Sequence, residues 1–162
     1  MKVYIKNKMI SLGGSSEVLN EKMEPIFKVE GNVVTFTRKK KMYDMDYKLL
    51  YTIQNRYWNF FSHKVFVKDA EGKKIATIKK NKWSFNQKFE ILDTEIPMSI
   101  DGKFFSATSH IMKDGQPSAT IVREFTLIND AFTLEANEED IPFYTALVIA
   151  LDNLNDERTE RR

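Results

Sequence analysis

Apolar and polar residues alternate through roughly the first 135 positions of the chain, and turn-forming residues divide the alternating runs. Val34 and Phe36 fall on one face of such a run, and Phe132 and Leu134 fall on one face of another. Pairs such as Asp114-Gly115 supply the positive backbone φ angle that tight hairpins require. A period of two predicts β-strands. About twelve runs follow one another at a spacing typical of an all-β sandwich or barrel.

The pattern changes after Asn137, where an almost continuous apolar segment predicts a helix over about residues 141 to 153. Asp140 is suited to the N-cap, and Pro142 to the first turn. Asn153 or Asn155 is expected to end the helix, and residues 156–162 are expected to form a charged, frayed tail. The sequence therefore predicts one domain over residues 1–155, followed by this tail.

The predicted helix is apolar nearly all round, so it belongs in a protein interior or a membrane. The uncharged stretch from Ile141 to Leu151 is well short of the ~20 residues that a membrane span needs. An eight-stranded barrel has an interior filled by its own side chains, whereas barrels of about eleven strands can hold a helix. We therefore expect a mainly β fold, an antiparallel barrel of about twelve strands that encloses the C-terminal helix. The alternative is a twisted sheet with the helix packed against one face.

Composition narrows the cellular setting. The 162 residues include no cysteine, which excludes disulfides and thiolate metal sites and favours a reducing compartment. Charged residues interrupt every short apolar run near the N-terminus, unlike a signal peptide. We expect a cytoplasmic protein, with peripheral membrane contact as a further expectation. The net charge of +2 is too small to indicate a nucleic-acid binder, so no nucleic-acid partner is expected.

Several segments resemble bacterial LURP-one-related proteins. The resemblance is carried by residues 4–13 and 25–31 near the start, by Ile78–Phe85 with Phe89–Ile91 in the middle, and by the closing segment Phe143–Asp152. It covers essentially residues 1–154. The resemblance implies a Tubby C-terminal-like fold, a twelve-stranded barrel around a hydrophobic helix that phospholipid scramblases also share. Tubby-like relatives bind phosphoinositide headgroups through basic residues, although no motif here matches those residues one by one.

Two basic clusters are the candidate binding residues of the sequence. The first is Arg38, Lys39, Lys40 and Lys41, and the second is Lys79, Lys80 and Lys82 beside Trp83. Such clusters can hold phosphate headgroups or an anionic leaflet, at roughly 1 kcal/mol per basic residue. The alternative is a solvated strand end or a charged guard on a sheet edge.

Other polar residues give weaker candidates. Asp44 and Asp46 could hold a hard cation, although a turn between strands is the favoured role. His63 and His110 are the two histidines, and each is expected to be a surface or strand residue. Nucleophile elbows, phosphate loops and dinucleotide fingerprints do not occur in the sequence. No enzymatic activity, catalytic residue, cofactor or metal is therefore expected.

The leading hypothesis is a non-enzymatic binding or scaffold module that contacts anionic phospholipid headgroups through the two basic clusters. A second hypothesis is a small-molecule carrier or enzyme that uses a cavity between the helix and the barrel wall. A third is a protein–protein adaptor.

Overall fold

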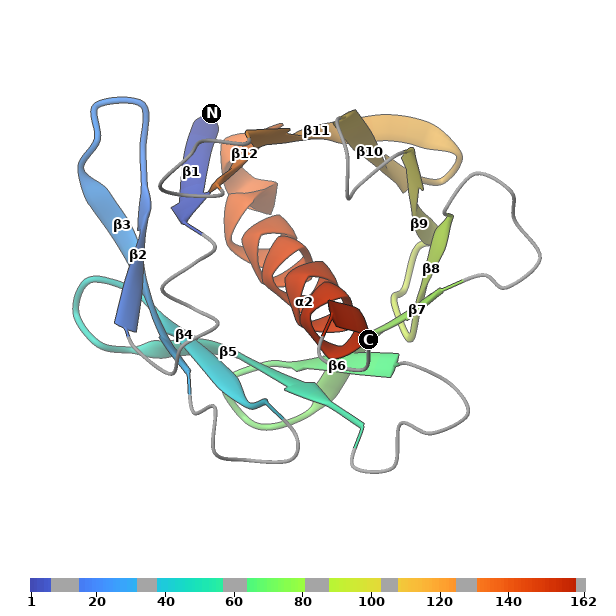
Figure 1. The fold of residues 1–162 in the computed structure, drawn as a ribbon, viewed down its shortest axis with the longest axis horizontal. Coiled ribbons are helices and arrows are strands. Elements are labelled where there is room, and N and C mark those ends of the chain that lie inside the picture. Colours follow the sequence, from blue (N-terminus) through green and yellow to red (C-terminus); the bar gives the residue numbers. More distant parts are fainter. Residues whose placement is uncertain are drawn as a thin grey trace.

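Twelve antiparallel strands close into a barrel around one helix (Figure 1). The computed structural model describes residues 1–6, 15–31, 38–56, 64–80, 88–102, 108–124 and 131–159, with side chains up to residue 154. The strands are β1 (Lys2–Lys6), β2 (Ser15–Leu19), β3 (Pro25–Gly31), β4 (Lys40–Tyr43), β5 (Leu49–Asn55), β6 (Lys64–Lys68), β7 (Lys74–Lys80), β8 (Phe89–Leu92), β9 (Met98–Gly102), β10 (Thr108–Lys113), β11 (Gln116–Glu124) and β12 (Ala131–Ala136).

Each strand pairs with its neighbours in the sequence, and β1 pairs with β12 to complete the ring. The closing register places Val3 opposite Leu134 and Ile5 opposite Phe132. Closure leaves every strand paired on both sides, which removes the exposed edges that antiparallel sheets otherwise need to protect. The predicted barrel is therefore confirmed, and the alternative of a twisted sheet with the helix on one face is wrong.

The alternation of the sequence sorts side chains between the inside and the outside of the barrel. In β6, Val65 and Val67 are fully buried while the residues between and beside them are partly exposed. The large side chains that are fully buried come from strands all round the ring and from the helix: Ile5, Met42, Ile53, Ile78, Phe89, Ile100, Ile111, Ile121, Phe132, Leu134 and Tyr144. One core therefore fills the space between barrel and helix.

The helix α2 (Ile141–Thr159) follows the short 3₁₀ helix η1 (Glu138–Asp140) and runs through the barrel. Every residue from Tyr144 to Leu154 is buried, and the helix packs mainly on β5, β6 and β12. The predicted central helix is confirmed, but its predicted end is wrong. The helix continues beyond Asn153 to Thr159, and the side-chain amide of Asn153 donates to the backbone carbonyl of Arg38 at 3.2 Å. The division into a domain over residues 1–155 and a charged tail stays a prediction.

The connections between antiparallel strands alternate between the two ends of the barrel. Five hairpin turns and the segment 137–140, which leads into α2, lie at one end. The helix enters there and runs to the opposite end, where β4, β6 and β8 begin and β5 and β7 finish. Figure 1 looks onto that opposite end, with the C-terminus nearer the viewer.

In the part of the chain that the structure describes, no helix combines the length and apolar character needed to cross a membrane.

Candidate functional site

The first basic cluster is divided between the inside and the outside of the barrel. Lys40 and Met42 occupy the inner face of β4, and Lys40 is only 4% exposed. Its Nζ lies 3.7 Å from Oδ2 of Asp152 on α2, so this lysine forms an internal ion pair and is not available to a surface ligand. Lys39 is exposed, Arg38 is half-buried, and Lys41 lies on the outer face opposite Glu30 of β3.

The second cluster lies at the end of β7. Lys79 and Lys80 are both half-exposed, and the Nζ of Lys79 is 3.3 Å from Oε2 of Glu90 on β8. Lys82 lies outside the described residues.

The barrel topology brings the two clusters to the same end. Three further cations, Arg56, Lys64 and Lys88, lie at the neighbouring strand ends, between and beside the two clusters. The backbone N–H of Arg56 donates to the carbonyl of Lys64 at 3.0 Å, and Lys64 stands opposite Lys79 in the β6–β7 pair. We call the following set the basic rim: Arg38, Lys39, Arg56, Lys64, Lys79, Lys80 and Lys88.

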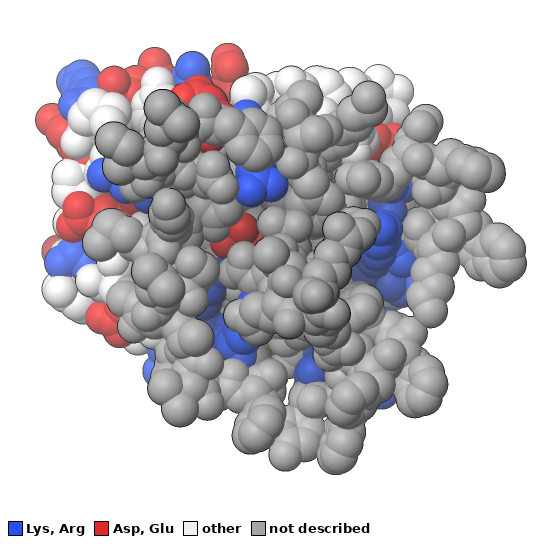
Figure 2. All heavy atoms as spheres, viewed as in Figure 1, with Lys and Arg blue, Asp and Glu red and all other residues white. Residues whose placement is uncertain are grey.

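Lysine and arginine outnumber acids along the basic rim. Its acidic neighbours include Glu90, which pairs with Lys79, and Asp101, whose Oδ1 lies 3.4 Å from the Nζ of Lys88. In the lower right of Figure 2, the described charged side chains that show are lysine or arginine. The sequence identified the two basic clusters but not Arg56, Lys64 or Lys88. These three residues are isolated in the sequence, and strand pairing alone brings them next to the clusters.

The opposite end of the barrel has the reverse charge. Each of its five hairpin turns, and the segment 137–140, contains more aspartate and glutamate than lysine. We call this the acidic end; it consists of residues 20–24, 44–48, 69–73, 93–97, 114–115 and 137–140. Opposite charge at the two ends of one barrel creates a field along its axis, which neither the net charge of the chain nor its local runs of charge reveal.

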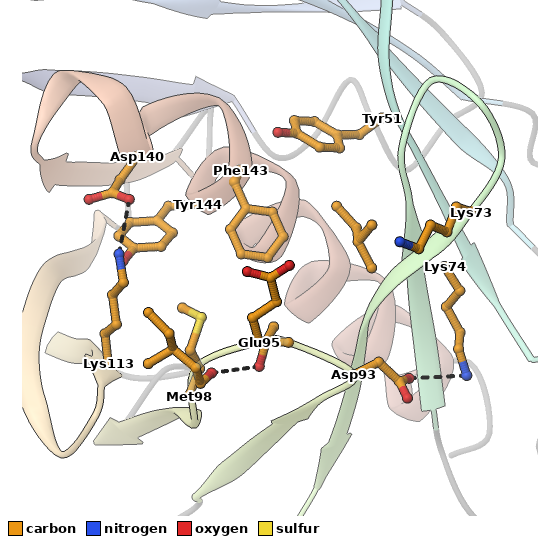
Figure 3. A pocket seen from close by; sticks show the side chains of 13 residues that line it. Tyr51, Lys73, Lys74, Asp93, Glu95, Met98, Lys113, Asp140, Phe143 and Tyr144 are labelled. Carbon is orange, nitrogen blue, oxygen red and sulfur yellow. Dashed lines mark hydrogen bonds and ion pairs between the residues drawn. The ribbon is translucent and has the colours of Figure 1, made fainter.

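A pocket of about 340 Å³ opens at the acidic end, between the first turn of α2 and the barrel wall (Figure 3). Its apolar surface comes from Phe143 and Tyr144 of α2 and from side chains of three strands, Tyr51, Ile75 and Met98. The rings of Tyr51 and Phe143 are 6.1 Å apart between centroids, as are those of Phe143 and Tyr144. The β8–β9 turn adds the apolar side chain of Ile96. The remaining lining residues are polar: Lys73, Lys74, Asp93, Thr94, Glu95, Lys113 and Asp140.

Two of the three lysines in the pocket are neutralised by carboxylates. The Nζ of Lys74 lies 3.0 Å from Oδ2 of Asp93, and that of Lys113 lies 3.7 Å from Oδ1 of Asp140. The structure gives no such partner to the side chains of Lys73 or Glu95 among the residues it describes. The polar rim of the pocket therefore contains one cation and one anion that are available to a ligand.

The environment of the pocket also shifts two pKa values. The hydrogen bond from the Thr77 hydroxyl, followed by the contact with Lys74, lowers the pKa of Asp93. Burial raises the pKa of the Tyr51 hydroxyl, and the negative charge of Asp69 adds to the effect. Near neutral pH Asp93 is thus an anion held by its neighbours, and Tyr51 is a neutral hydrogen-bonding group on the pocket wall.

The weaker candidates take structural roles where the structure describes them. One carboxylate oxygen of Asp44 accepts hydrogen bonds from the backbone N–H groups of Asp46 and Lys48, at 3.0 and 2.9 Å, so the favoured role of a turn is confirmed. His110 is exposed on β10, with its Nδ1 3.3 Å from Oγ1 of Thr120. His63 lies outside the described residues. Within the described ranges, no three histidine, aspartate or glutamate side chains come together as a metal site would require.

Comparison with known proteins identifies the family. The model of the LURP-one-related family matches residues 1–152, and the chain therefore belongs to this family. Neither a curated protein nor a solved structure matches the chain.

Proposed function

We propose that this member of the LURP-one-related family is a non-enzymatic binding domain that docks on anionic phospholipid headgroups through its basic rim. The observation that carries the proposal is the convergence of both basic clusters, together with Arg56, Lys64 and Lys88, on one end of a barrel whose other end is acidic. A barrel with this charge separation would turn its basic end toward a negative surface and its acidic end away from it.

The proposal differs from the sequence-based hypothesis in the residues that it uses. Lys40 is no longer among the proposed lipid-binding residues, because it is buried against Asp152. Arg56, Lys64 and Lys88 are added. Juxtamembrane cations contribute about 1 kcal/mol each at an anionic surface, so several of them acting together suffice for reversible binding at low salt.

Vesicle co-sedimentation tests this proposal. The protein is expected to pellet with vesicles that contain phosphatidylserine and to stay in the supernatant with vesicles of phosphatidylcholine alone. Replacing Lys39, Lys64 and Lys80 by glutamine is expected to weaken partitioning roughly 100-fold, at about 1 kcal/mol per residue. Added salt is expected to release the wild-type protein.

A control variant with the same change in net charge replaces Lys22, Lys48 and Lys68, which lie at or next to the acidic end. This variant is expected to pellet like the wild type. Equal pelleting with neutral and anionic vesicles, or equal loss of binding in both triple variants, would contradict the proposal. Thermal melting of both variants confirms that each is folded.

The remaining expectations from the sequence stay predictions. They are a cytoplasmic location, a bacterial source and membership of the wider Tubby C-terminal-like superfamily. The protein–protein adaptor is the alternative function to test if vesicle binding fails, by pull-down from native cells with the rim variant as the comparison.

A further inference from the structure

The pocket at the acidic end lies at the opposite end of the barrel from the basic rim, so a second ligand could bind there independently. Its volume of about 340 Å³ is near the lower limit of small-molecule sites, which span roughly 300–1,000 Å³ and are mostly apolar with a few polar groups. Phe143, Tyr144, Tyr51, Ile75 and Met98 supply that apolar surface. A ligand of about one aromatic ring matches this size.

The charges around the pocket favour a positive ligand. Lys74 and Lys113 are neutralised by Asp93 and Asp140, and the turns that surround the pocket are acidic. Clefts surrounded by charge of one sign concentrate ligands of the opposite sign. A cation approaching this end of the barrel is therefore attracted by the field before it reaches any single side chain.

The position of Glu95 gives that cation a place to bind. In Figure 3 the carboxylate of Glu95, from the β8–β9 turn, is directed toward the ring of Phe143. An ammonium bound close to both would form an ion pair with the carboxylate and could lie against the negative face of the aromatic ring. Ion pairing and the cation–π attraction would then act together on one group.

We propose that this pocket binds a small organic amine, with its protonated nitrogen close to both Glu95 and Phe143 and its apolar part against Ile75 and Met98. Lys73, on the other side of the pocket, opposes the positive charge and limits affinity. The site is independent of the basic rim, so failure of vesicle binding leaves it standing, and its own failure leaves the vesicle proposal standing.

Isothermal titration calorimetry with three probes of similar apolar shape tests the proposal. The probes are 2-phenylethylamine, which is a cation, 3-phenylpropanoate, which is an anion, and 2-phenylethanol, which is neutral. The amine is expected to bind in roughly the millimolar range or tighter, and at least about three-fold more tightly than either other probe. Binding of 3-phenylpropanoate as tight as that of the amine, or no amine binding at about 10 mM, would overturn the proposal.

Two substitutions of opposite sign separate ligand contact from a structural effect. Glu95→Gln is expected to weaken amine binding about three- to five-fold, the size of an exposed ion pair. Lys73→Gln is expected to strengthen amine binding by a similar factor, because it removes a repulsion. Both side chains are exposed, so neither change is expected to alter the melting temperature.

Glu71→Gln, on the neighbouring turn and outside the pocket lining, is the matched control and is expected to leave the affinity within two-fold of wild type. The proposal is refuted if Glu95→Gln and Lys73→Gln shift amine binding in the same direction, or if Glu95→Gln and Glu71→Gln have equal effects.

Discussion

The internal ion pair between Lys40 and Asp152 provides the sharpest test of how the helix is held in the barrel. Lys40 begins β4 and Asp152 belongs to the last buried turns of α2, so the pair joins the wall to the helix near the basic end. The two side chains are 5% and 3% exposed, and their Nζ and Oδ2 atoms are 3.7 Å apart. Both charges are thus shielded from water, and each lies close enough to the other to stabilise it.

Removing only the lysine charge is expected to be costly. Lys40→Met retains most of the side-chain volume but removes the ammonium that lies 3.7 Å from the buried carboxylate of Asp152. Breaking a buried pair in this way costs about 3–5 kcal/mol. For a protein of this size, each kcal/mol corresponds to about 2–4 °C in melting temperature, so a fall of roughly 6–20 °C is expected.

Removing both charges is expected to cost far less. In Lys40→Met/Asp152→Leu both charges of the pair are removed together, and apolar replacements of buried pairs are often neutral or stabilising. The double variant should therefore be more stable than Lys40→Met alone, with a coupling energy of about 0.5–3 kcal/mol or more. Urea denaturation of the wild type, both single variants and the double variant measures this coupling directly.

The control is the next lysine along the same strand. Lys41 lies on the outer face of β4 and is half-exposed, so Lys41→Met is expected to change the free energy of unfolding by less than about 0.5 kcal/mol. If Lys40→Met and Lys41→Met are equally stable, or if the effects at Lys40 and Asp152 simply add, the pair does not hold the helix and the reasoning fails.

Three further predictions test the packing, the backbone and the charges of the barrel. Leu147 is fully buried, so Leu147→Ala is expected to lower the free energy of unfolding by about 2–5 kcal/mol, as measured by urea denaturation. Leu147→Asp is expected to prevent soluble folding, because it places a charge in the core. A normally stable Leu147→Asp variant would place the helix outside the core. Gly102→Ala is expected to lower the melting temperature more than Gly72→Ala. Both glycines have a positive φ, but only at Gly102 would an added Cβ meet the backbone, at 2.8 Å from the carbonyl oxygen of Thr108. Equal shifts in melting temperature would contradict this. The pKa of Asp93 is lowered in the folded state, so its contribution to stability is present above the unfolded pKa and is lost as the pH falls. The difference in melting temperature between wild type and Asp93→Asn should therefore shrink from about pH 5 to pH 3. A constant difference would refute the effect.

Much of the fold could be predicted from residue patterns because those patterns repeat along the whole chain. Period-two alternation identifies strands one at a time, and the apolar segment after Asp140 cannot remain in water. Together they require a sheet large enough to surround a helix, which the structure confirms. The end of the helix was mispredicted because Asn153 was assumed to act locally, whereas its side chain bonds to Arg38, distant in the sequence.

The burial of Lys40 was missed although the sequence contained a clue. Lys40 and Met42 are two residues apart on one predicted strand, so they share a face, and the buried Met42 places Lys40 inside. The run of four basic residues suggested one surface cluster because charge was considered apart from the strand period. Its partner Asp152 was the other clue, since it lies in a helix predicted to be buried.

The sequence suggested a cavity between the helix and the barrel wall, but the residues that line the pocket could not be predicted, because they come from five separate regions of the chain. Tyr51, Lys73, Glu95, Lys113 and Phe143 belong to different strands, turns and the helix, and no local pattern links them. Their convergence depends on the strand order and on the point at which α2 enters the barrel. Neither the order nor the entry point has a signal in a single sequence.

Barrel closure restricts where this protein can bind partners. All twelve strands are paired on both sides, so strand addition at an exposed edge is not available to a partner. The interior is occupied by α2 and its contacts. Binding is left to the outer wall and to the two ends, and the ends differ in charge: one carries the basic rim over β4 to β8, and the other is acidic and contains the aromatic pocket. If the basic rim faces an anionic membrane, the pocket opens toward the solvent, so a small amine can enter and leave without releasing the protein from the surface.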